Sequence, residues 1–244
     1  MKFVGMLRIK DEAAWIAEVI ASLLPLCEQI FILDDHSTDD TAEICRSFPE
    51  VTLLQSPFEG LDEARDKNYL LEHVIKSGAD FVIHIDGDEV LVPDGQQMIR
   101  DLVARVPNVA IAKFRVLYAW NDKRTIRTDG IYACFSRPSL FRIAGQNTAG
   151  LRFGTTPHGG NLHCWNHPQN LQGAEVNAKH IGLIHYGYIT PEIRARKHAF
   201  YNRVDPNNAY EDQYRHVHQG DPGGPPADAR LKHAGPLKLE PLSL

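Results

Sequence analysis

Two aspartates that stand two residues apart form the pattern in this sequence best suited to chemistry. Asp86 and Asp88 belong to the run Asp86-Gly87-Asp88-Glu89, which directly follows the apolar segment 81–85. Carboxylates on one turn can both reach a hard divalent cation, and such oxygen ligands suit Mg²⁺ or Mn²⁺ better than Zn²⁺. Mg²⁺ completes its shell with phosphate oxygens and water, so a cation here would also hold a diphosphate. The alternative is an acidic turn facing solvent, but placement after a buried strand favours the cation site.

A second acidic group follows an earlier apolar segment, 29–33. Asp34 and Asp35 open the run Asp34-Asp35-His36-Ser37-Thr38-Asp39. Carboxylates at the end of a strand can accept hydrogen bonds from a nucleobase or from ribose hydroxyls. The same side chains could instead organise the turn and cap the next helix. The residues alone leave both interpretations open.

The chain has 12 histidines, most of them in its second half. His163 and His167 have the H-x-x-x-H spacing of a zinc site, but Pro168 and the Gly and Asn around it disfavour the helix that such a site needs. A histidine-ligated zinc hydrolase is therefore the weakest function considered. His84 lies inside an apolar run, and we interpret it as a core residue with a hydrogen-bond partner.

The elements that must position these residues alternate between short apolar runs and amphipathic segments. This alternation is typical of a parallel sheet covered by helices. We expect strands at residues 3–9, 29–33, 51–54 and 81–85, and helices after residue 15, within 37–48, at 61–76 and at 96–106.

Longer β-like runs characterise the second half of the chain. Thr190-Pro191 predicts the start of a last helix, since a capping residue there precedes proline in the first turn. A loop rich in Gly and Asn separates the β-like runs. These runs lie at 109–120, 131–141 and 180–188, and the loop lies at 145–173.

Composition and charge exclude several classes of protein. With 43% hydrophobic and 23% charged residues, the 244-residue chain has a globular composition. Its 26 Lys and Arg against 31 Asp and Glu leave a formal charge of −5, which argues against a nucleic-acid partner. We expect no transmembrane segment, no signal peptide and a cytoplasmic location. The four cysteines form no C-x-x-C pair and are interpreted as apolar fillers.

Taken in order, these motifs resemble family 2 glycosyltransferases with the GT-A fold. The run Asp34 to Asp39 looks like their D-D-x-S-x-D signature, and Asp86 to Glu89 looks like their D-x-D-E. Residues 6–12 resemble the first strand and loop of the family, and residues 67–80 match its spacing between the two signatures.

The resemblance implies an α/β fold with a Rossmann-like, mostly parallel central sheet flanked by helices. A smaller mixed subdomain would lie on the acceptor side. We expect a nucleotide-sugar-binding subdomain at 1–106, an acceptor-side subdomain with a closing helix at 107–219, and a flexible or partner-draped tail at 220–244. The tail could mediate a homo-oligomer.

In function, the resemblance implies transfer of a sugar from a nucleotide diphosphate sugar to a hydroxyl of a saccharide or other acceptor. It also implies a divalent cation, Mn²⁺ or Mg²⁺, and inversion at the sugar. A nucleotidyltransferase would use similar carboxylates but would carry a Gly-rich basic loop near its first strand, which residues 7–12 lack. A non-catalytic nucleotide-sugar-binding module is the other alternative.

Residue roles follow from the matched motifs. Asp35 would contact the base, Asp86 the ribose or the metal, and Asp88 the metal directly. His185 resembles the histidine that completes the metal shell, and Lys197 resembles the cation that stabilises the departing diphosphate. The remaining predicted donor-binding residues are Arg8, Glu12, Asp34, Lys67 and Asn68.

Three residues are admissible as the base that inversion requires: Asp129, Glu175 and His158. Of these we name His158 as the candidate; Gly159, which follows it, stands where similar enzymes often offer an acid. The sequence also departs from the family at Asp11, where Asn is usual, and this leaves the base preference open.

Overall fold

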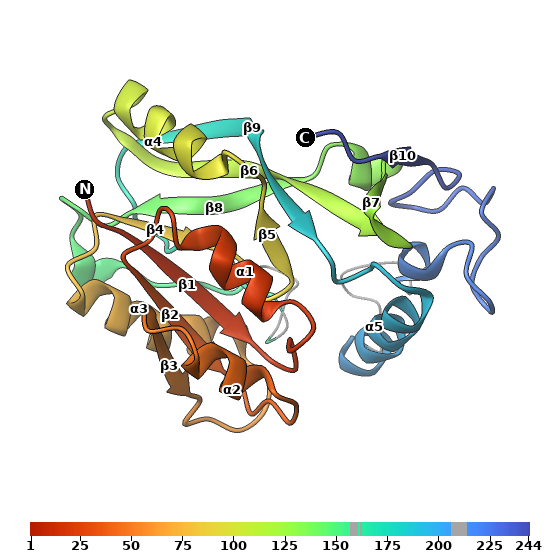
Figure 1. The fold of residues 1–244 in the computed structure, drawn as a ribbon, viewed down its shortest axis with the longest axis horizontal. Helices are drawn as coiled ribbons and strands as arrows, with labels where there is room; N and C mark the ends of the chain where they lie inside the picture. Colours follow the sequence, from red (N-terminus) through yellow and green to blue (C-terminus); the bar gives the residue numbers. More distant parts are fainter. Residues whose placement is uncertain (157–160, 162, 206–213) are drawn as a thin grey trace. The chain divides into compact units, whose positions relative to one another are not determined.

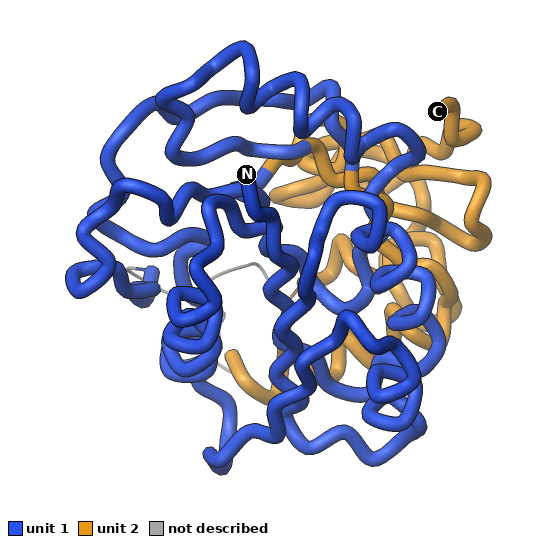
Figure 2. Tube along the Cα trace, turned by 60° about the vertical axis from the view of Figure 1, so that its left-hand side comes forward, with its two compact units in different colours: residues 1–114, 137–182 blue, residues 115–136, 183–244 orange. Residues whose placement is uncertain are grey.

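The computed structural model of the chain describes two compact units, shown in different colours in Figure 2. Unit 1 comprises residues 1–114 and 137–182, and unit 2 comprises residues 115–136 and 183–244. The residues whose structure is described are 1–156, 161, 163–205 and 214–244.

Four parallel strands form the centre of unit 1 (Figure 1): β1 (Phe3–Ile9), β2 (Gln29–Asp34), β3 (Val51–Gln55) and β4 (Phe81–His84). Their order is β4-β1-β2-β3. The nearly unbroken apolar sequences of β1, β2 and β4 fit strands that are buried on both faces. The carboxyl ends of β4, β1 and β2 consequently lie next to one another at one edge of the sheet. All four strands were expected from the sequence and are confirmed.

Helices cover both faces of this sheet. A Cβ added at Gly5 of β1 would lie 3.3 Å from Leu23 Cδ1, so α1 (Ile16–Leu23) packs closely on one face. The neighbouring Met6 points the other way, into a cluster with side chains of α3 (Glu63–Lys76). The alternation of side chains along a strand therefore places the two helices on opposite faces.

Capping residues set the ends of the longer helices. The Asp62 side chain accepts a hydrogen bond from Arg65 N (2.9 Å) at the start of α3, and Gly78 follows the helix with a φ of +73°. In unit 2, Thr190 Oγ1 accepts from Ile193 N (3.3 Å) at the start of α5 (Pro191–Val204). Both starts agree with the sequence prediction to within two residues.

Other elements of unit 1 complete the sheet and its cover. β8 (Ser136–Arg142) runs antiparallel to β4. β6 (Val109–Trp120) and β9 (Ala174–His185) begin in unit 1 and end in unit 2. The remaining elements are α2 (Thr41–Arg46), β5 (Glu89–Leu91), α4 (Gly95–Arg105) and the 3-10 turn η2 (Thr148–Gly150).

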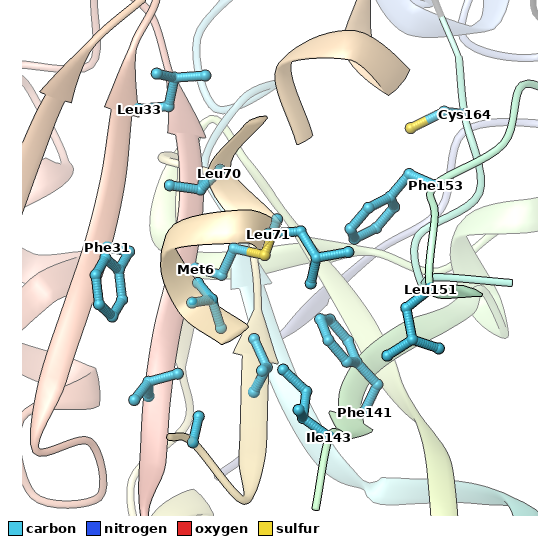
Figure 3. Packing of buried hydrophobic residues seen from close by; sticks show 14 residues of the cluster. Met6, Phe31, Leu33, Leu70, Leu71, Phe141, Ile143, Leu151, Phe153 and Cys164 are labelled. Carbon is cyan, nitrogen blue, oxygen red and sulfur yellow. The ribbon is translucent and has the colours of Figure 1, made fainter. Parts of the chain in front are cut away.

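The core of unit 1 lies between the sheet and α3 (Figure 3). Met6, Phe31 and Leu33 of the strands meet Leu70 and Leu71 of the helix. Segments from much later in the chain close the same cluster with Phe141, Ile143, Leu151, Phe153 and Cys164. Unit 1 therefore depends on residues 137–182 for part of its core.

Unit 2 is built on a small antiparallel sheet with the order β10-β7-β6, and the described residues of this unit also include α5. Trp120, Tyr132 and Ala234 form its buried cluster. The other elements are β7 (Asp122–Arg127), β10 (Leu239–Pro241), and the 3-10 turns η1 (Gly130–Ala133) and η3 (Arg215–His218).

Residues 220–244, expected from the sequence to form a flexible or partner-draped tail, make contacts within unit 2. The buried Gln219 side chain donates to the carbonyls of Ala227, Ala229 and Gly235. Lys238 N donates to Asp129 Oδ1 (3.0 Å), and β10 pairs with β7. Backbone groups of this segment are thus satisfied within unit 2, which a composition rich in Gly and Pro does not reveal.

Two expectations need correction. The strand expected at 131–141 begins as the turn η1, and only residues 136–142 form β8. Cys134 is exposed, whereas the other three cysteines are buried as expected. Among the residues with a described structure, none of the helices combines the length and the hydrophobicity needed to cross a bilayer.

Candidate functional site

The turn after β4 carries the predicted aspartate pair, and a cation from β8 meets it. Arg137 Nη2 lies 3.4 Å from Asp86 Oδ2 and also forms an ion pair with Glu89 Oε2. Asp86 N in turn donates to Glu89 Oε2 (3.1 Å). Arg137 therefore supplies positive charge to the acidic turn from a strand that pairs with β4.

Asp86 and Asp88 differ in exposure. The Asp86 side chain is 49% exposed, whereas Asp88 is buried. Partial desolvation would raise the pKa of Asp86, but the charges of Arg137 and Lys67 outweigh it and hold the pKa below its ordinary value. Asp86 is consequently a carboxylate at neutral pH, half open to an approaching cation.

Gly87 allows this turn to lie against the loop that follows β1. A Cβ at Gly87 would come within 2.8 Å of Ile9 Cγ2 and 2.9 Å of Glu12 Cγ. Any larger residue would force the side chain of Ile9 or Glu12 to move. Glu12, predicted to line the donor pocket, is thereby placed beside the aspartate turn.

Of the two roles that the sequence left open for the acidic run after β2, the structure shows turn organisation, and nucleotide binding stays a prediction. Asp34 Oδ1 accepts from Ser37 N (3.0 Å), so this buried side chain organises the turn. Asp11 Oδ1 accepts from Thr38 N (2.7 Å) and ties the loop after β1 to the loop after β2. The unusual Asp11 therefore has a structural role. Asp35 is held by a different partner.

A chain of ion pairs fixes Asp35 to α3. Arg8 Nη2 donates to Asp35 Oδ2 (2.6 Å), and Arg8 Nε donates to Asp66 Oδ2 (2.8 Å). Asp66, which is fully buried, also accepts from Arg65 Nε (2.9 Å). Arg65 stacks over the ring of Phe58 at 4.6 Å. The predicted residues Arg8 and Asp35 are thus brought together, with Asp66 as their anchor.

Lys67 is a buried cation on the same helix. Its Nζ lies 3.4 Å from Glu63 Oε2. Burial alone would lower the pKa of Lys67, but Glu63, then Cys164 and Asp86, raise it above the ordinary value. Lys67 therefore stays charged and contributes to the field around the aspartate turn.

Asn68, the next predicted residue, has a positioning contact. Its side chain donates from Nδ2 to Phe153 O (2.9 Å) and accepts at Oδ1 from Phe153 N (2.8 Å). This reciprocal pair ties α3 to the segment after η2. His84, interpreted as a core residue, is confirmed as buried with Nδ1 3.0 Å from Asn166 O, and burial lowers its pKa to about 3.

Two predicted residues belong to unit 2. The His185 ring packs against Tyr118 and Tyr188, with both pairs of ring centroids 5.1 Å apart. Lys197 Nζ lies 5.2 Å from the centroid of the Tyr188 ring. The roles of His185 as a metal ligand and of Lys197 at the diphosphate stay predictions.

The three candidates for the catalytic base differ in the contacts that their side chains make. Asp129 is buried, and its two oxygens accept from Arg127 at 2.8 and 2.9 Å, so it is already committed. Glu175 pairs with Lys113 at 2.5 Å on the surface of unit 1. His158 lies outside the described residues.

No three His, Cys, Asp or Glu side chains within residues 1–156, 161, 163–205 and 214–244 are placed to hold one metal ion together. The predicted ligands Asp86 and Asp88 belong to unit 1 and His185 belongs to unit 2. The trio therefore stays a prediction.

Comparison with known proteins identifies the family. The family described as "Glycosyl transferase family 2" matches residues 8–161, which is more than half of the chain and includes both aspartate motifs. The chain belongs to glycosyl transferase family 2. The resemblance inferred from the motifs is thereby confirmed.

Relatives of this family 2 chain are longer than the chain itself. "Uncharacterized protein Rv3786c" of Mycobacterium tuberculosis and "Uncharacterized protein Mb3815c" of Mycobacterium bovis are both 26% identical over 221 residues. The match covers 85% of this chain and 51% of each relative, so the chain spans about half the length of the curated relatives it matches.

Solved structures support the fold. The crystal structure of S. aureus TarS 1-349 in complex with UDP-GlcNAc has a TM-score of 0.53 at 14% identity, covering 89% of this chain and 70% of that chain. The complex of the same protein with UDP gives the same values. The predicted α/β, GT-A class is confirmed.

Sequence reasoning missed two charged residues of this family 2 site. Asp66 lies on the apolar stripe of α3, four residues before Leu70, and Arg137 lies two residues before the buried Ser139 on β8. In both cases the sequence offered one signal: a charged residue stands where the periodicity of the surrounding residues predicts a buried side chain.

Proposed function

We propose that the chain transfers a sugar from a nucleoside diphosphate sugar to an acceptor hydroxyl, with inversion and with Mn²⁺ or Mg²⁺. Membership of glycosyl transferase family 2 supports the class of reaction. UDP-GlcNAc is the first donor to test, because the TarS structure of similar fold was determined with it.

One observation carries this proposal: the strand order β4-β1-β2 gathers three predicted segments at one edge of the sheet. Asp86 and Asp88 follow β4, and Glu12 follows β1. Asp34 ends β2, and Asp35 follows it. Ligands of open α/β sheets bind beyond the carboxyl ends of their strands. The edge thus offers carboxylates for a nucleoside and for a cation side by side.

The donor groups fit a divalent cation of the Mg²⁺ or Mn²⁺ type. Asp86 is ionised and half exposed, and its ligand atoms are hard oxygens. We propose that Asp86 and Asp88 hold the cation. When bound, such a cation would neutralise charge that builds on the diphosphate as the sugar leaves.

The residues of unit 1 would orient the donor. Asp35, fixed by Arg8, would accept a hydrogen bond from the base, and Asp34 would keep the turn in shape. Lys67 would add positive charge near the diphosphate, and Asn68 would hold the segment around Phe153 in place. Pre-arranged charges of this kind lower the barrier because they need no reorganisation.

The transfer step needs a base. The acceptor oxygen would attack the anomeric carbon as the bond from that carbon to the diphosphate breaks, and the base would take the hydroxyl proton. His158 remains our candidate. Lys197 would stabilise the departing diphosphate.

Nucleotide binding tests this proposal directly. We expect UDP with Mn²⁺ to raise the melting temperature of the full chain, since a ligand at 100 times its Kd stabilises by about 2.7 kcal/mol. Asp88→Asn should abolish the Mn²⁺-dependent part of this shift. The control Asp101→Asn removes the same charge from the exposed surface of α4 in the same unit and should leave the shift unchanged.

A panel of nucleoside diphosphates with and without Mn²⁺ identifies the base, and release of UDP from UDP-GlcNAc measures turnover. Binding without turnover in the presence of varied acceptors would indicate a binding module. The proposal fails if no nucleoside diphosphate stabilises the protein, or if Asp88→Asn and Asp101→Asn behave alike.

A further inference from the structure

Unit 2 contains a cavity that the proposed transfer does not use. Its volume is about 550 Å³. It is lined by His198 and Asn202 of α5, by Arg215 and His218 of η3, and by the turn 223–226. A volume of this order is within the range of small-molecule sites.

Two imidazoles face each other in the cavity. The ring centroids of His198 and His218 are 3.9 Å apart, and the planes are inclined by 32°. Burial first, and then the charge of His198, lowers the pKa of His218 below its ordinary value. Protonating both rings without a counter-ion would place two positive charges in near contact.

The described charged groups around this pair are mainly cationic. Arg215 lines the cavity, and His216 lies near enough to oppose protonation of His218. Asp221 is the acid that favours it. Its two oxygens, however, accept from Arg194 Nε and Nη2, both at 2.6 Å, so its charge is largely neutralised. Among the described residues around the cavity, positive charge therefore outweighs negative charge.

Two walls of the cavity, η3 and the turn 223–226, are held together before any ligand binds. Gly224 N donates to Asp221 O (3.0 Å), and Gly220 N donates to Pro225 O (2.7 Å). A Cβ at Gly224 would lie 2.1 Å from the carbonyl oxygen of His218, so the turn packs directly on η3. Binding here would cost little ordering of the chain.

We propose that this cavity is a second binding site, which takes the phosphoryl group of a small phosphorylated molecule between His198, His218 and Arg215. A tetrahedral oxyanion can accept from an arginine and from both imidazoles at once. The Asn202 amide nitrogen lies 3.1 Å from His198 Nε2, and rotation of the amide would present its oxygen to a protonated ring. The remaining volume would hold the rest of the molecule.

Proton linkage gives this site a direct test. The anion would raise the pKa of His218, so binding takes up a proton and is favoured as the pH falls through the range of imidazole titration. Sulfate is the cleaner probe because it keeps its charge over this range, and inorganic phosphate is the second. We expect calorimetry on the full chain to show sulfate binding roughly tenfold tighter at about pH 6 than at about pH 8.

Variants distinguish sulfate binding in the cavity from sulfate binding at other positively charged side chains. Arg215→Gln should weaken sulfate binding roughly tenfold or more. The control Arg230→Gln removes the same charge from an exposed position of unit 2 outside the cavity lining and should leave binding unchanged. The ring signals of His198 and His218, assigned in NMR spectra with His198→Gln and His218→Gln, should move with sulfate in the wild-type protein.

Two results would overturn the proposal. The first is the absence of saturable sulfate and phosphate binding. The second is equal binding by Arg215→Gln and Arg230→Gln, which would assign the anion to another part of the chain. Because no nucleotide enters these measurements, their outcome does not depend on whether the proposed glycosyl transfer is correct.

Discussion

Replacing Arg137 by methionine tests the charge balance of the aspartate turn. Arg137 is 6% exposed and Glu89 is 2% exposed, and the two form an ion pair. Removing one partner of a buried pair leaves the other charge without compensation, which costs about 3–5 kcal/mol. A chain of this length loses about 2–4 °C of melting temperature per kcal/mol, so Arg137→Met should melt roughly 6–20 °C lower.

The double variant Arg137→Met, Glu89→Gln gives the decisive comparison. It removes both charges, while the glutamine oxygen can still accept from Asp86 N. We expect the double variant to be only about 1–2 kcal/mol less stable than the wild type, which makes it more stable than the single variant. Urea denaturation followed by circular dichroism and tryptophan fluorescence measures all three proteins.

Arg105→Met is the matched control. Arg105 lies in the same unit, 80% exposed, with Nη2 3.8 Å from Asp101, and such surface pairs contribute under about 1 kcal/mol. If Arg137→Met costs no more than Arg105→Met, Arg137 is not the counter-charge of the turn. A double variant no more stable than the single one would lead to the same conclusion.

Two further substitutions probe the edge of the site and the C-terminal segment. Gly87→Ala should lower the free energy of unfolding by about 1–3 kcal/mol, because the added methyl group would meet Ile9 and Glu12. It should also weaken UDP binding, measured by calorimetry. Unchanged binding would show that the turn does not need this close approach. Gln219→Leu leaves three carbonyls of residues 227–235 without their donor. We expect a loss of about 1–3 kcal/mol of stability and faster proteolysis within 220–244. An unchanged digestion pattern would show that Gln219 does not hold this segment.

Local patterns were enough to predict the parallel strands and the acids that follow them. A strand made of consecutive apolar residues is shielded from water only when both of its faces are buried. The residue at which the apolar run ends marks the edge of the sheet. The positions of Asp34, Asp35, Asp86 and Asp88 therefore follow from the sequence, as does the cap at Thr190.

Contacts between distant segments could not be predicted in this way. Arg137 reaches Asp86 across 51 residues because β8 pairs antiparallel with β4, and Gln219 meets carbonyls in a segment without regular periodicity. Strand register and the pairing of buried charges depend on which surfaces meet in three dimensions.

The sequence by itself determined the type of sheet and the acidic groups at its carboxyl edge, because periodicity and turn chemistry are local properties. The tertiary structure decided which cations face those acids, that Asp129 is committed to Arg127, and that the C-terminal segment packs within unit 2. The physical reason is that a buried charge or carbonyl must find a partner wherever the folded chain offers one, and that place is not encoded in neighbouring residues.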